Sequence, residues 1–322
     1  MTLRHHRTIA NYITVIKRGI SYSTSPHRDL RYVPKYDELH KEDLNQLNDF
    51  IDSSKRLFVL TGAGLSTESG IRDYRSEGVG QYAVSDQRPI NYQEFLKNPV
   101  RRHRYWARNF AAWPIFSSFQ PNICHKILAD MEKYGNLYWL VTQNVDGLHS
   151  KAGSVNLTEL HGTTAKVGCL SCSYETSRQE FQEVLSHVNK GWVSNSTGMQ
   201  APDGDIVVPE KDADSFKMVD CPSCGGILKP KVIFFGDNVP ASVKDFIFEK
   251  FSVTDALLVI GSSLHTYSSF RYILAAKERK IPIGIINIGK TRGDDQADLK
   301  ISVRAGDILP KLKLNWYQEG IS

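Results

Sequence analysis

The chain has 322 residues, of which 41% are hydrophobic and 23% charged, and its formal net charge is +5 at pH 7. This length is enough for one large domain, with or without a smaller one, to bury a core without disulfides. The mild charge, with no dominant basic block, argues against nucleic-acid binding. The longest apolar runs have the length of strands, which argues against a membrane span.

Residues 1–28 differ in composition from the rest of the chain. They contain several Arg, Lys and His residues interleaved with Ile and Val, then serines, and no acidic residue appears before Asp29. This composition is typical of a mitochondrial transit peptide, and the apolar core of a secretory signal is missing. We therefore expect residues 1–28 to direct the chain to the mitochondrial matrix. A disordered basic tail is the alternative.

Apolar spacing predicts the next elements in chain order. Residues 38–53 have helical periodicity, and short apolar runs predict buried strands at 57–60, 137–141, 232–235, 256–260 and 281–286. Helices are predicted between strands, for example at 123–133 and 270–280. The alternation predicts an α/β fold with a Rossmann-like parallel sheet. Small or polar residues follow four of the strands, and in such sheets the ligand lies beyond the carboxyl ends of the strands.

Two stretches interrupt this alternation. Residues 76–120 are aromatic and basic, and residues 165–227 carry paired cysteines, so we predict that they form a smaller inserted domain. The Rossmann-like domain then comprises 35–75, 121–164 and 228–314, followed by a tail at 315–322. Residues 190–215 are rich in Gly, Ser, Asn, Asp and Pro, which is typical of a long surface loop.

Four of the five cysteines occur as two Cys-x-x-Cys pairs. Cys169 is paired with Cys172, and Cys221 with Cys224. Four thiolates suit tetrahedral zinc and leave no open position for a substrate, so the pattern predicts one structural Zn²⁺ in a zinc ribbon. Two unrelated reducible pairs are the alternative. Cys124 lies in an apolar helical pattern and is expected to be buried.

A glycine turn, Thr61-Gly62-Ala63-Gly64, follows the strand at 57–60. Glycines let a backbone approach a pyrophosphate, and the start of a helix behind them supplies amides and a positive dipole. Thr67 stands where the dinucleotide fingerprint has its third glycine, which argues against a hydride-transferring oxidoreductase. The segment from Gly70 to Arg75 continues as a loop that fits closing over a nucleotide. A solvated surface charge is the alternative for Arg75.

Together these motifs resemble the sirtuin family. The matching segments, in family order, are 62–66, 70–75, 142–149, 161–162, the four cysteines, 261–263 and 286–287, and the resemblance extends over about residues 35–314. The basic N-terminal segment, Tyr74-Arg75 and Tyr105-Trp106-Ala107-Arg108 are most similar to mitochondrial class II members. The resemblance implies an NAD-dependent protein lysine deacylase that releases nicotinamide and O-acyl-ADP-ribose.

The resemblance also implies roles for individual residues. His161 would act as general base on the ribose hydroxyls, with Asn144 and Asp146 completing the catalytic set. The implied NAD contacts are Gly62, Ala63, Gly64, Ser66, Thr67, Asp73, Tyr74, Arg75, Tyr82, Gln143, Asn144, Val145, Asp146, Gly261, Ser262, Ser263, Asn287, Ile288, Gly289 and Ala305. The implied peptide-binding segment is Val232, Ile233, Phe234, Phe235 and Gly236, which would pair with the substrate backbone. Taken alone, His161 would be read as a buried structural histidine.

Tyr105 and Arg108 bear on the choice of acyl group. They lie at i and i+3 and share one helix face. The resemblance implies that they meet the carboxylate of an acidic acyl group, since Arg binds carboxylates through two hydrogen bonds. A surface Arg beside a core aromatic is the alternative. We also expect the 190–215 extension to restrict access to the acyl channel.

The resemblance suggests substrates as well. Candidate acyl groups are lipoyl, biotinyl, glutaryl and hydroxymethylglutaryl, with weak activity on acetyl-lysine. Candidate partners are acylated lysines of matrix proteins, among them lipoyl-bearing dehydrogenase complexes, and we expect a monomer that binds neither nucleic acid nor membranes.

Three positions depart from the family, and two further functions stay open. Arg72 replaces a usual proline, Phe234 a frequent tryptophan and Ala305 a common cysteine. An ADP-ribosyltransferase that uses the same NAD site is one alternative. A zinc-ribbon adaptor with a vestigial nucleotide site is the other, and the complete set of Gln143, Asn144, Asp146 and His161 argues against it.

Overall fold

The computed structural model describes residues 30–196 and 201–314, together with the two-residue strands β1 (Thr14–Val15) and β2 (Ile20–Ser21). The predicted tail, and the predicted transit peptide apart from those two strands, lie outside the described residues. Both stay predictions.

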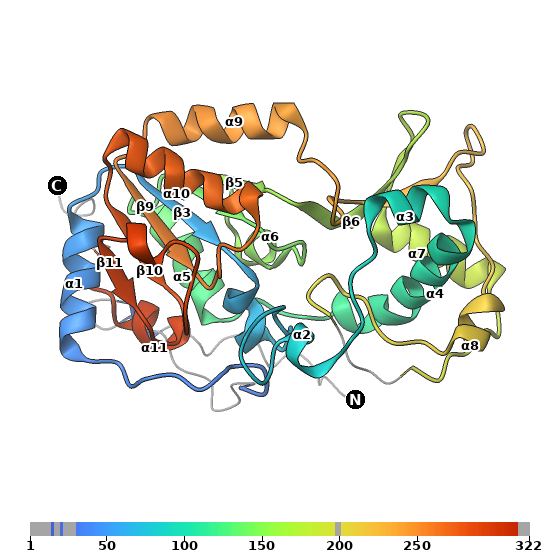
Figure 1. Cartoon of the computed structure of the whole chain (residues 1–322), viewed down its shortest axis with the longest axis horizontal. Coiled ribbons are helices and arrows are strands. Elements are labelled where there is room, and N and C mark those ends of the chain that lie inside the picture. Colours follow the sequence, from blue (N-terminus) through green and yellow to red (C-terminus); the bar gives the residue numbers. More distant parts are fainter. Residues whose placement is uncertain (1–13, 16–19, 22–29, 197–200, 315–322) are drawn as a thin grey trace, which may run out of the picture.

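A six-stranded parallel sheet in the order β11-β10-β9-β3-β4-β5 forms the centre of the larger domain (Figure 1). Its strands are β3 (Leu57–Thr61), β4 (Trp139–Thr142), β5 (Leu157–Glu159), β9 (Ala256–Ile260), β10 (Ile283–Ile286) and β11 (Leu299–Ile301). Strand β3 has β4 on one side and β9 on the other, so the strand order reverses at β3, where this type of sheet binds its ligands. The predicted Rossmann-like sheet is confirmed.

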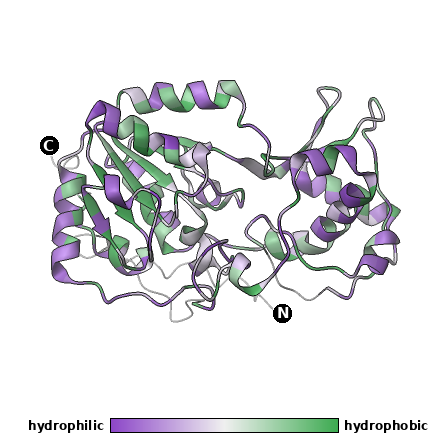
Figure 2. Cartoon of the chain, viewed as in Figure 1, coloured by the Kyte–Doolittle hydropathy of each residue, from purple (hydrophilic) through white to green (hydrophobic). Residues whose placement is uncertain are grey.

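Helices cover both faces of this sheet. Successive strand residues face opposite sides, so that Val59 and Leu258 pack against α1 and α5, whereas Phe58 and Leu257 pack against α9 and α10. The helices are α1 (Lys41–Asp52), α5 (Ile123–Lys133), α6 (Leu148–Ala152), α9 (Ala241–Ser252), α10 (Tyr267–Arg279) and α11 (Ala305–Ile308). Figure 2 shows the resulting contrast between the apolar strands and the helices, which carry both apolar and polar residues. Burial on both faces explains why the strands read as unbroken apolar runs.

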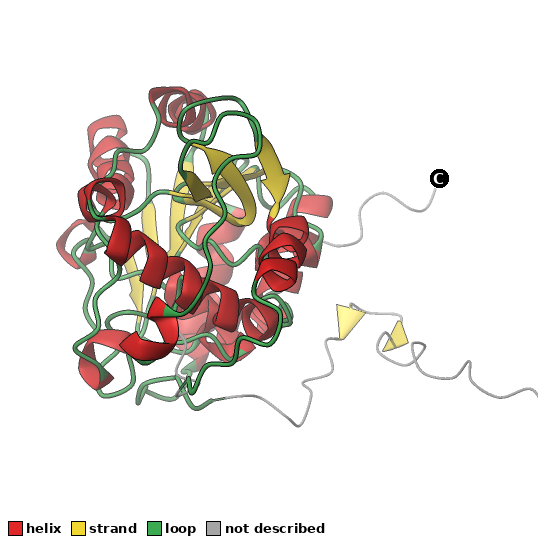
Figure 3. Cartoon of the chain, turned by 90° about the vertical axis from the view of Figure 1, so that its right-hand side faces the viewer, coloured by secondary structure: helices red, strands yellow, loops and turns green. Residues whose placement is uncertain are grey.

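A smaller domain lies beside the sheet and has its own core. It contains α3 (Tyr92–Lys97), α4 (Pro99–Phe116), α7 (Arg178–Val188), α8 (Glu210–Asp214) and the antiparallel sheet β7-β6-β8, with β6 at Gly162–Cys169, β7 at Glu175–Ser177 and β8 at Leu228–Val232. Trp106, Phe95 and Phe181 are buried at its centre. Figure 3 shows the molecule from the side of this domain.

The remaining short elements are η1 (Ala63–Ser69) and α2 (Gln81–Val84), which lie between β3 and the smaller domain, and η2 (Asp294–Gln296) and η3 (Leu309–Lys311), which belong to the larger domain. Among the described residues, none of the helices combines the length and the apolar character needed to cross a bilayer.

The predicted strand at 232–235 is wrong. The strand at this position is β8, which ends at Val232 and pairs antiparallel with β6 in the small sheet. Residues 233–235 line a cavity, with Ile233 packed against the core of the larger domain and Phe234 in that of the smaller one, and apolar content alone does not distinguish this from a buried strand.

Candidate functional site

A cavity of about 1020 Å³ opens at the carboxyl ends of the parallel strands. Its walls come from the residues that follow β3, β4, β9 and β10, and from the segment after β8. Every residue that we expected to contact NAD lines this cavity except Tyr82, and so do His161 and the whole segment 232–236. The structure therefore brings together, at one strand edge, side chains that are far apart in the sequence.

Gly62 and Gly64 bring the ends of β3 and β9 into direct contact. The backbone N–H of Gly62 donates to the carbonyl of Ile260 (3.1 Å), and that of Gly64 donates to the carbonyl of Gly261 (2.9 Å). A Cβ at Gly62 would lie 2.8 Å from the Gly261 oxygen. These glycines are thus required by strand packing, apart from any ligand. The helix expected behind the turn is only the short 3₁₀ segment η1, so its dipole is weaker than we expected.

Asn144, Ser66 and Asp146 form a chain of hydrogen bonds in the wall of the cavity. Asn144 Nδ2 donates to Ser66 Oγ (3.1 Å), and the Ser66 hydroxyl donates to Asp146 Oδ2 (2.7 Å). The backbone N–H of Leu148 donates to the other Asp146 oxygen (2.9 Å). Burial raises the pKa of Asp146 above its ordinary value, although these hydrogen bonds oppose the shift. These hydrogen bonds fix the orientation of Asn144 and Asp146, the two predicted catalytic side chains.

His161 is held by hydrogen bonds at both ring nitrogens. Its Nδ1 lies 3.0 Å from the carbonyl oxygen of Gln143, which can only accept, so Nδ1 carries the proton. In the neutral ring Nε2 then accepts a hydrogen bond from the Ser268 hydroxyl at 2.8 Å. Burial lowers the pKa of His161 to about 4, so the ring is neutral at physiological pH. A neutral imidazole with a lone pair on Nε2 is a competent proton acceptor.

Gln143 connects three loops at the edge of the sheet. Its Nε2 donates to Ser262 Oγ (2.7 Å) and to the Thr61 carbonyl (3.2 Å), and its Oε1 accepts from Thr266 Oγ1 (3.5 Å). Its carbonyl also orients His161. The position of the histidine is therefore coupled to the glycine turn and to the loop after β9.

The loop after Gly70 is ordered by local contacts. Asp73 accepts hydrogen bonds from the backbone N–H groups of Arg75 (3.1 Å) and Ser76 (2.8 Å). Tyr82, the one predicted NAD contact outside the cavity lining, packs behind Tyr74 with ring centroids 5.5 Å apart. Arg72, which replaces a usual proline, places its guanidinium 4.3 Å from the ring centroid of Tyr32. Arg72 therefore links this loop to the segment that precedes α1.

Tyr105 and Arg108 do not line the main cavity. Tyr105 is 5% exposed and packs against Phe95 and Phe234, with centroids 5.5 and 5.3 Å apart. Arg108 Nε donates to both carboxylate oxygens of Asp205 (2.9 and 3.1 Å) and lines a second cavity of about 430 Å³. The sequence contained no sign of this partner, because Asp205 lies in the 190–215 extension.

The extension itself reaches the main cavity. Pro202 and Asp203 line it, and burial together with nearby Asp205 raises the pKa of Asp203 to about 6. Ile206 and Val208 of the same segment are buried in the core of the smaller domain. Much of the expected surface loop is thus packed structure.

The four paired cysteines converge on one point. Their Sγ atoms all lie within 4.8 Å of one another, with Cys169–Cys224 and Cys172–Cys221 each at 3.6 Å. Tetrahedral zinc with Zn–S bonds of about 2.3 Å requires sulfurs roughly 3.8 Å apart, so the residues fit the metal. Cys124 is fully buried, as expected.

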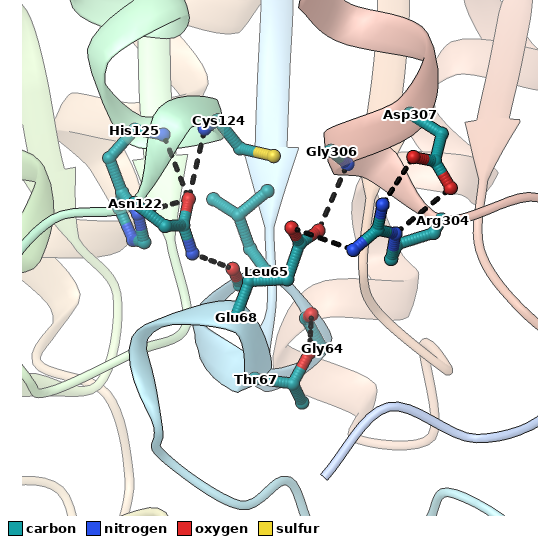
Figure 4. A network of polar contacts seen from close by, with 10 residues as sticks. All are labelled: Gly64, Leu65, Thr67, Glu68, Asn122, Cys124, His125, Arg304, Gly306 and Asp307. Atoms are coloured by element: carbon teal, nitrogen blue, oxygen red, sulfur yellow. Dashed lines mark hydrogen bonds and ion pairs between the residues drawn. The ribbon is translucent and has the colours of Figure 1, made fainter. Parts of the chain in front are cut away.

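Several residues of the site gave no signal in the sequence. Ser268 contacts His161, and Glu68 pairs with Arg304 and with the backbone N–H of Gly306 behind the glycine turn (Figure 4). Each depends on a partner more than one hundred residues away in the chain, so no local pattern could have identified it.

Comparisons with known proteins identify the family of this chain. The Sir2 family model matches residues 62–268. The chain is 52% identical to the human "NAD-dependent protein lipoamidase sirtuin-4, mitochondrial", over 87% of this chain and 88% of that protein. It is 48% identical to the Drosophila melanogaster "NAD-dependent protein deacylase Sirt4", over 92% and 94% of the two chains.

Solved structures give the same result. One, described as "Structural Basis for the Mechanism and Regulation of Sir2 Enzymes", is 28% identical, with 84% of this chain and 96% of that chain covered and a TM-score of 0.66. A second, "Sir2 bound to acetylated peptide", is 25% identical, with 83% and 96% covered and a TM-score of 0.64. The chain therefore belongs to the sirtuin family.

Proposed function

We propose that this chain is an NAD-dependent deacylase that removes acyl groups from lysines of mitochondrial matrix proteins. The observation that carries the proposal is His161, which is neutral and presents Nε2 within a cavity that also contains the glycine turn and the Asn144–Ser66–Asp146 chain. The names of the relatives agree, since they describe NAD-dependent deacylases or lipoamidases and, for human sirtuin-4, a mitochondrial protein.

The residues that line the cavity are suited to hold NAD. When bound, NAD supplies a ribose carbon that becomes electrophilic as nicotinamide leaves. Gly62 and Gly64 line the cavity with bare backbone, which a pyrophosphate could approach, and Gln143 offers an amide that is already oriented by Ser262. Asn144 and Asp146, which also line the cavity, would hold the nicotinamide side of NAD and favour the departure of nicotinamide.

His161 then acts as the general base. Its Nε2 accepts a proton from a ribose hydroxyl, while the proton on Nδ1 stays in the hydrogen bond to Gln143. The hydroxyl oxygen so activated would take the acyl group from lysine, whose acyl oxygen replaces nicotinamide at the ribose carbon. One water is consumed overall, and the products would be free lysine, nicotinamide and O-acyl-ADP-ribose. This division between the two ring nitrogens follows from the Gln143 carbonyl, which cannot donate.

The protein substrate enters along the segment after β8. Residues 232–236 line the cavity, and the backbone N–H of Ile233 donates to the His161 carbonyl (2.8 Å). Because this segment is anchored next to the catalytic base, a peptide that pairs with it places its acyl-lysine near His161. The four cysteines would hold one zinc ion at the end of β6, in a structural role.

The acyl groups that we propose are lipoyl, biotinyl, glutaryl and hydroxymethylglutaryl, on proteins such as lipoyl-bearing dehydrogenase complexes. Arg108 supports the acidic members of this set, because Asp205 engages the guanidinium through its Nε. The guanidinium has five N–H donors, so several are left for a carboxylate that reaches it through the second cavity, which Arg108 lines. We further propose that the protein acts as a monomer, with a larger domain formed by residues 35–75, 121–164 and 228–314 and a smaller one formed by 76–120 and 165–227.

Mass spectrometry of the products tests the proposal. Peptides that carry acetyl, glutaryl, hydroxymethylglutaryl or lipoyl lysine would be incubated with NAD and either the wild type or His161→Tyr. O-acyl-ADP-ribose formed only by the wild type is the expected result. NAD consumption with ADP-ribose attached to protein, and no deacylated peptide, would overturn it in favour of the transferase.

A further inference from the structure

Arg271 on α10 is a cation in the wall of the main cavity that has no acidic partner among the described residues. It lines the cavity, and within residues 30–196 and 201–314 its side chain makes no hydrogen bond or ion pair. Its Nε is buried and unsatisfied. A buried charged donor without an acceptor is costly, and such groups in native structures call for an explanation.

The guanidinium is nevertheless held in place. It lies 5.2 Å from the ring centroid of Tyr267, one turn earlier on the same helix. Stacking on an aromatic face positions the guanidinium and leaves its positive charge and its N–H donors available. Arg271 is therefore oriented for an anion that the protein itself does not supply.

A second cation lines the cavity from the neighbouring helix. Lys244 on α9 lines the cavity, and none of the described residues forms an ion pair with it. Helices α9 and α10 pack together through Phe248 and Tyr272, whose ring centroids are 5.3 Å apart, and Figure 1 shows them side by side. Between 232–244 and 265–271 the charged lining residues are Asp237, Lys244 and Arg271, so positive charge is in excess.

The position of Arg271 relative to His161 limits what the anion can be. Ser268 contacts His161 Nε2, and Arg271 follows three residues later on the same helix face, roughly 4.5 Å along the axis. An extended peptide advances about 3.4 Å per residue. A carboxylate that reaches Arg271 therefore belongs to a residue within about three positions of the acyl-lysine.

We propose that Arg271 and Lys244 form a subsite for an acidic side chain of the substrate protein, so that the enzyme selects acyl-lysines flanked by Asp or Glu. This rests on the proposed deacylase function and adds the substrate class to it. The subsite is separate from Arg108, which lies in the smaller domain and faces the second cavity. It therefore recognises the peptide and is independent of the acyl group.

The test varies the flanks at constant acyl group. One acyl-lysine peptide is made with Glu, Gln or Lys at each of the three positions on either side, and kcat/KM and the dissociation constant are measured. The wild type is expected to prefer the best Glu peptide over its Gln counterpart by about three- to tenfold, and to lose this preference at high salt. Equal values for Glu and Gln peptides would overturn the proposal.

Charge reversal gives the sharper result. Arg271→Glu is expected to invert the order of the peptides, so that those with Lys flanks become the best substrates. Lys244→Gln is expected to reduce the preference for Glu over Gln flanks. Lys277→Gln removes one exposed charge from the same helix outside the cavity and is the matched control, expected to keep the wild-type order. An unchanged order in Arg271→Glu would rule the subsite out.

The two proposals fail differently. Turnover of the neutral Gln peptide tests the deacylase function regardless of its flanks. If no peptide is turned over, the dissociation constants of the Glu, Gln and Lys peptides still report the subsite. Circular dichroism of Arg271→Glu and Lys244→Gln verifies that both variants are folded. If one of them does not fold, the flank preference of the other still tests the subsite.

Discussion

Glu68 and Arg304 form an ion pair of 3.4 Å in which both side chains are only 5% exposed. Glu68 belongs to η1, directly after the glycine turn, and also accepts a hydrogen bond from the backbone N–H of Gly306 at 3.0 Å (Figure 4). Arg304 additionally donates to Asp307 through Nε (2.9 Å). The pair thus joins the glycine turn to the start of α11, and both residues line the cavity.

The two partners of this pair are not equivalent on substitution. Arg304→Leu leaves the Glu68 carboxylate buried without its cation, and we expect it to lower the free energy of unfolding by about 3 kcal/mol. Glu68→Gln keeps an acceptor for Gly306 and leaves Arg304 paired with Asp307, so a loss of about 1 kcal/mol is expected. Chemical denaturation of both variants and of the double variant measures this. Equal losses in the two single variants would contradict it.

One structural zinc ion per chain is expected at the four cysteines. Removal with a strong chelator, or Cys221→Ser, is expected to lower the melting temperature and to release the smaller domain, because metal binding there is coupled to folding. Metal content by mass spectrometry and thermal unfolding provide the measurements. Cys124→Ala, which alters the cysteine outside the cluster, is the control and retains one zinc. A chain that melts unchanged without metal would count against a structural role.

The ring of His161 is expected to stay neutral, with the proton on Nδ1, well below the ordinary histidine pKa. Burial lowers its pKa to about 4, so in the ligand-free protein it should be unprotonated at pH 5.5. Nitrogen-15 NMR of labelled histidine reports both the charge and the tautomer. If His161 titrates near pH 6.5, or if its neutral form carries the proton on Nε2, the hydrogen bond to the Gln143 carbonyl does not fix the ring.

Much of the fold was predictable because its strands are buried on both faces. Phe58 and Val59 point to opposite sides of the sheet and both are fully buried, so β3 reads as an uninterrupted apolar run. By contrast, β5, β7 and β11 have only three residues each, and the longer β6 has a register irregularity. Such strands carry no clear period, which is why the sequence did not indicate them.

The site was predictable only where its residues lie in contiguous motifs. Gly62 and Gln143 each belong to a run that follows a strand, and the topology brings these runs to one edge. The partner of Arg108 is 97 residues away, and that of Ser268 is 107 residues away. Contacts of this kind arise from tertiary packing, so a single sequence holds no information that identifies them.

The contact between Arg108 and Asp205 yields a prediction on acyl choice. Arg108→Ala is expected to reduce the rate on glutaryl-lysine relative to acetyl-lysine by about tenfold, because the carboxylate loses a charge-assisted hydrogen bond. The measurement is the ratio of kcat/KM values for the two peptides. Arg104→Ala is the matched control, since Arg104 lies on the same helix but pairs with Asp214 and Glu210. An unchanged ratio in Arg108→Ala would remove this residue from acyl recognition.

Glu159, at the end of β5, makes the stability of the protein depend on pH. Burial is the main cause that raises its pKa to about 7, nearby Asp146 adds to the shift, and Thr163 and Lys166 oppose it. The folded state therefore binds a proton that the unfolded state releases above pH 4.5. This contribution to stability is complete below pH 4.5 and is lost as the pH rises through about 7.

Glu159→Gln isolates this effect, since glutamine resembles the protonated acid at every pH. We expect the variant to equal the wild type near pH 4.5 and to be more stable at pH 8, by up to roughly 3 kcal/mol. Urea denaturation at both pH values measures the difference. Glu175 is the opposite case, because its ion pair with Lys231 lowers its pKa in the folded state. The stability that Glu175 contributes, and that Glu175→Gln removes, is therefore lost as the pH falls. If the stability difference between Glu159→Gln and the wild type is the same at both pH values, the pKa of Glu159 is not raised in the folded state.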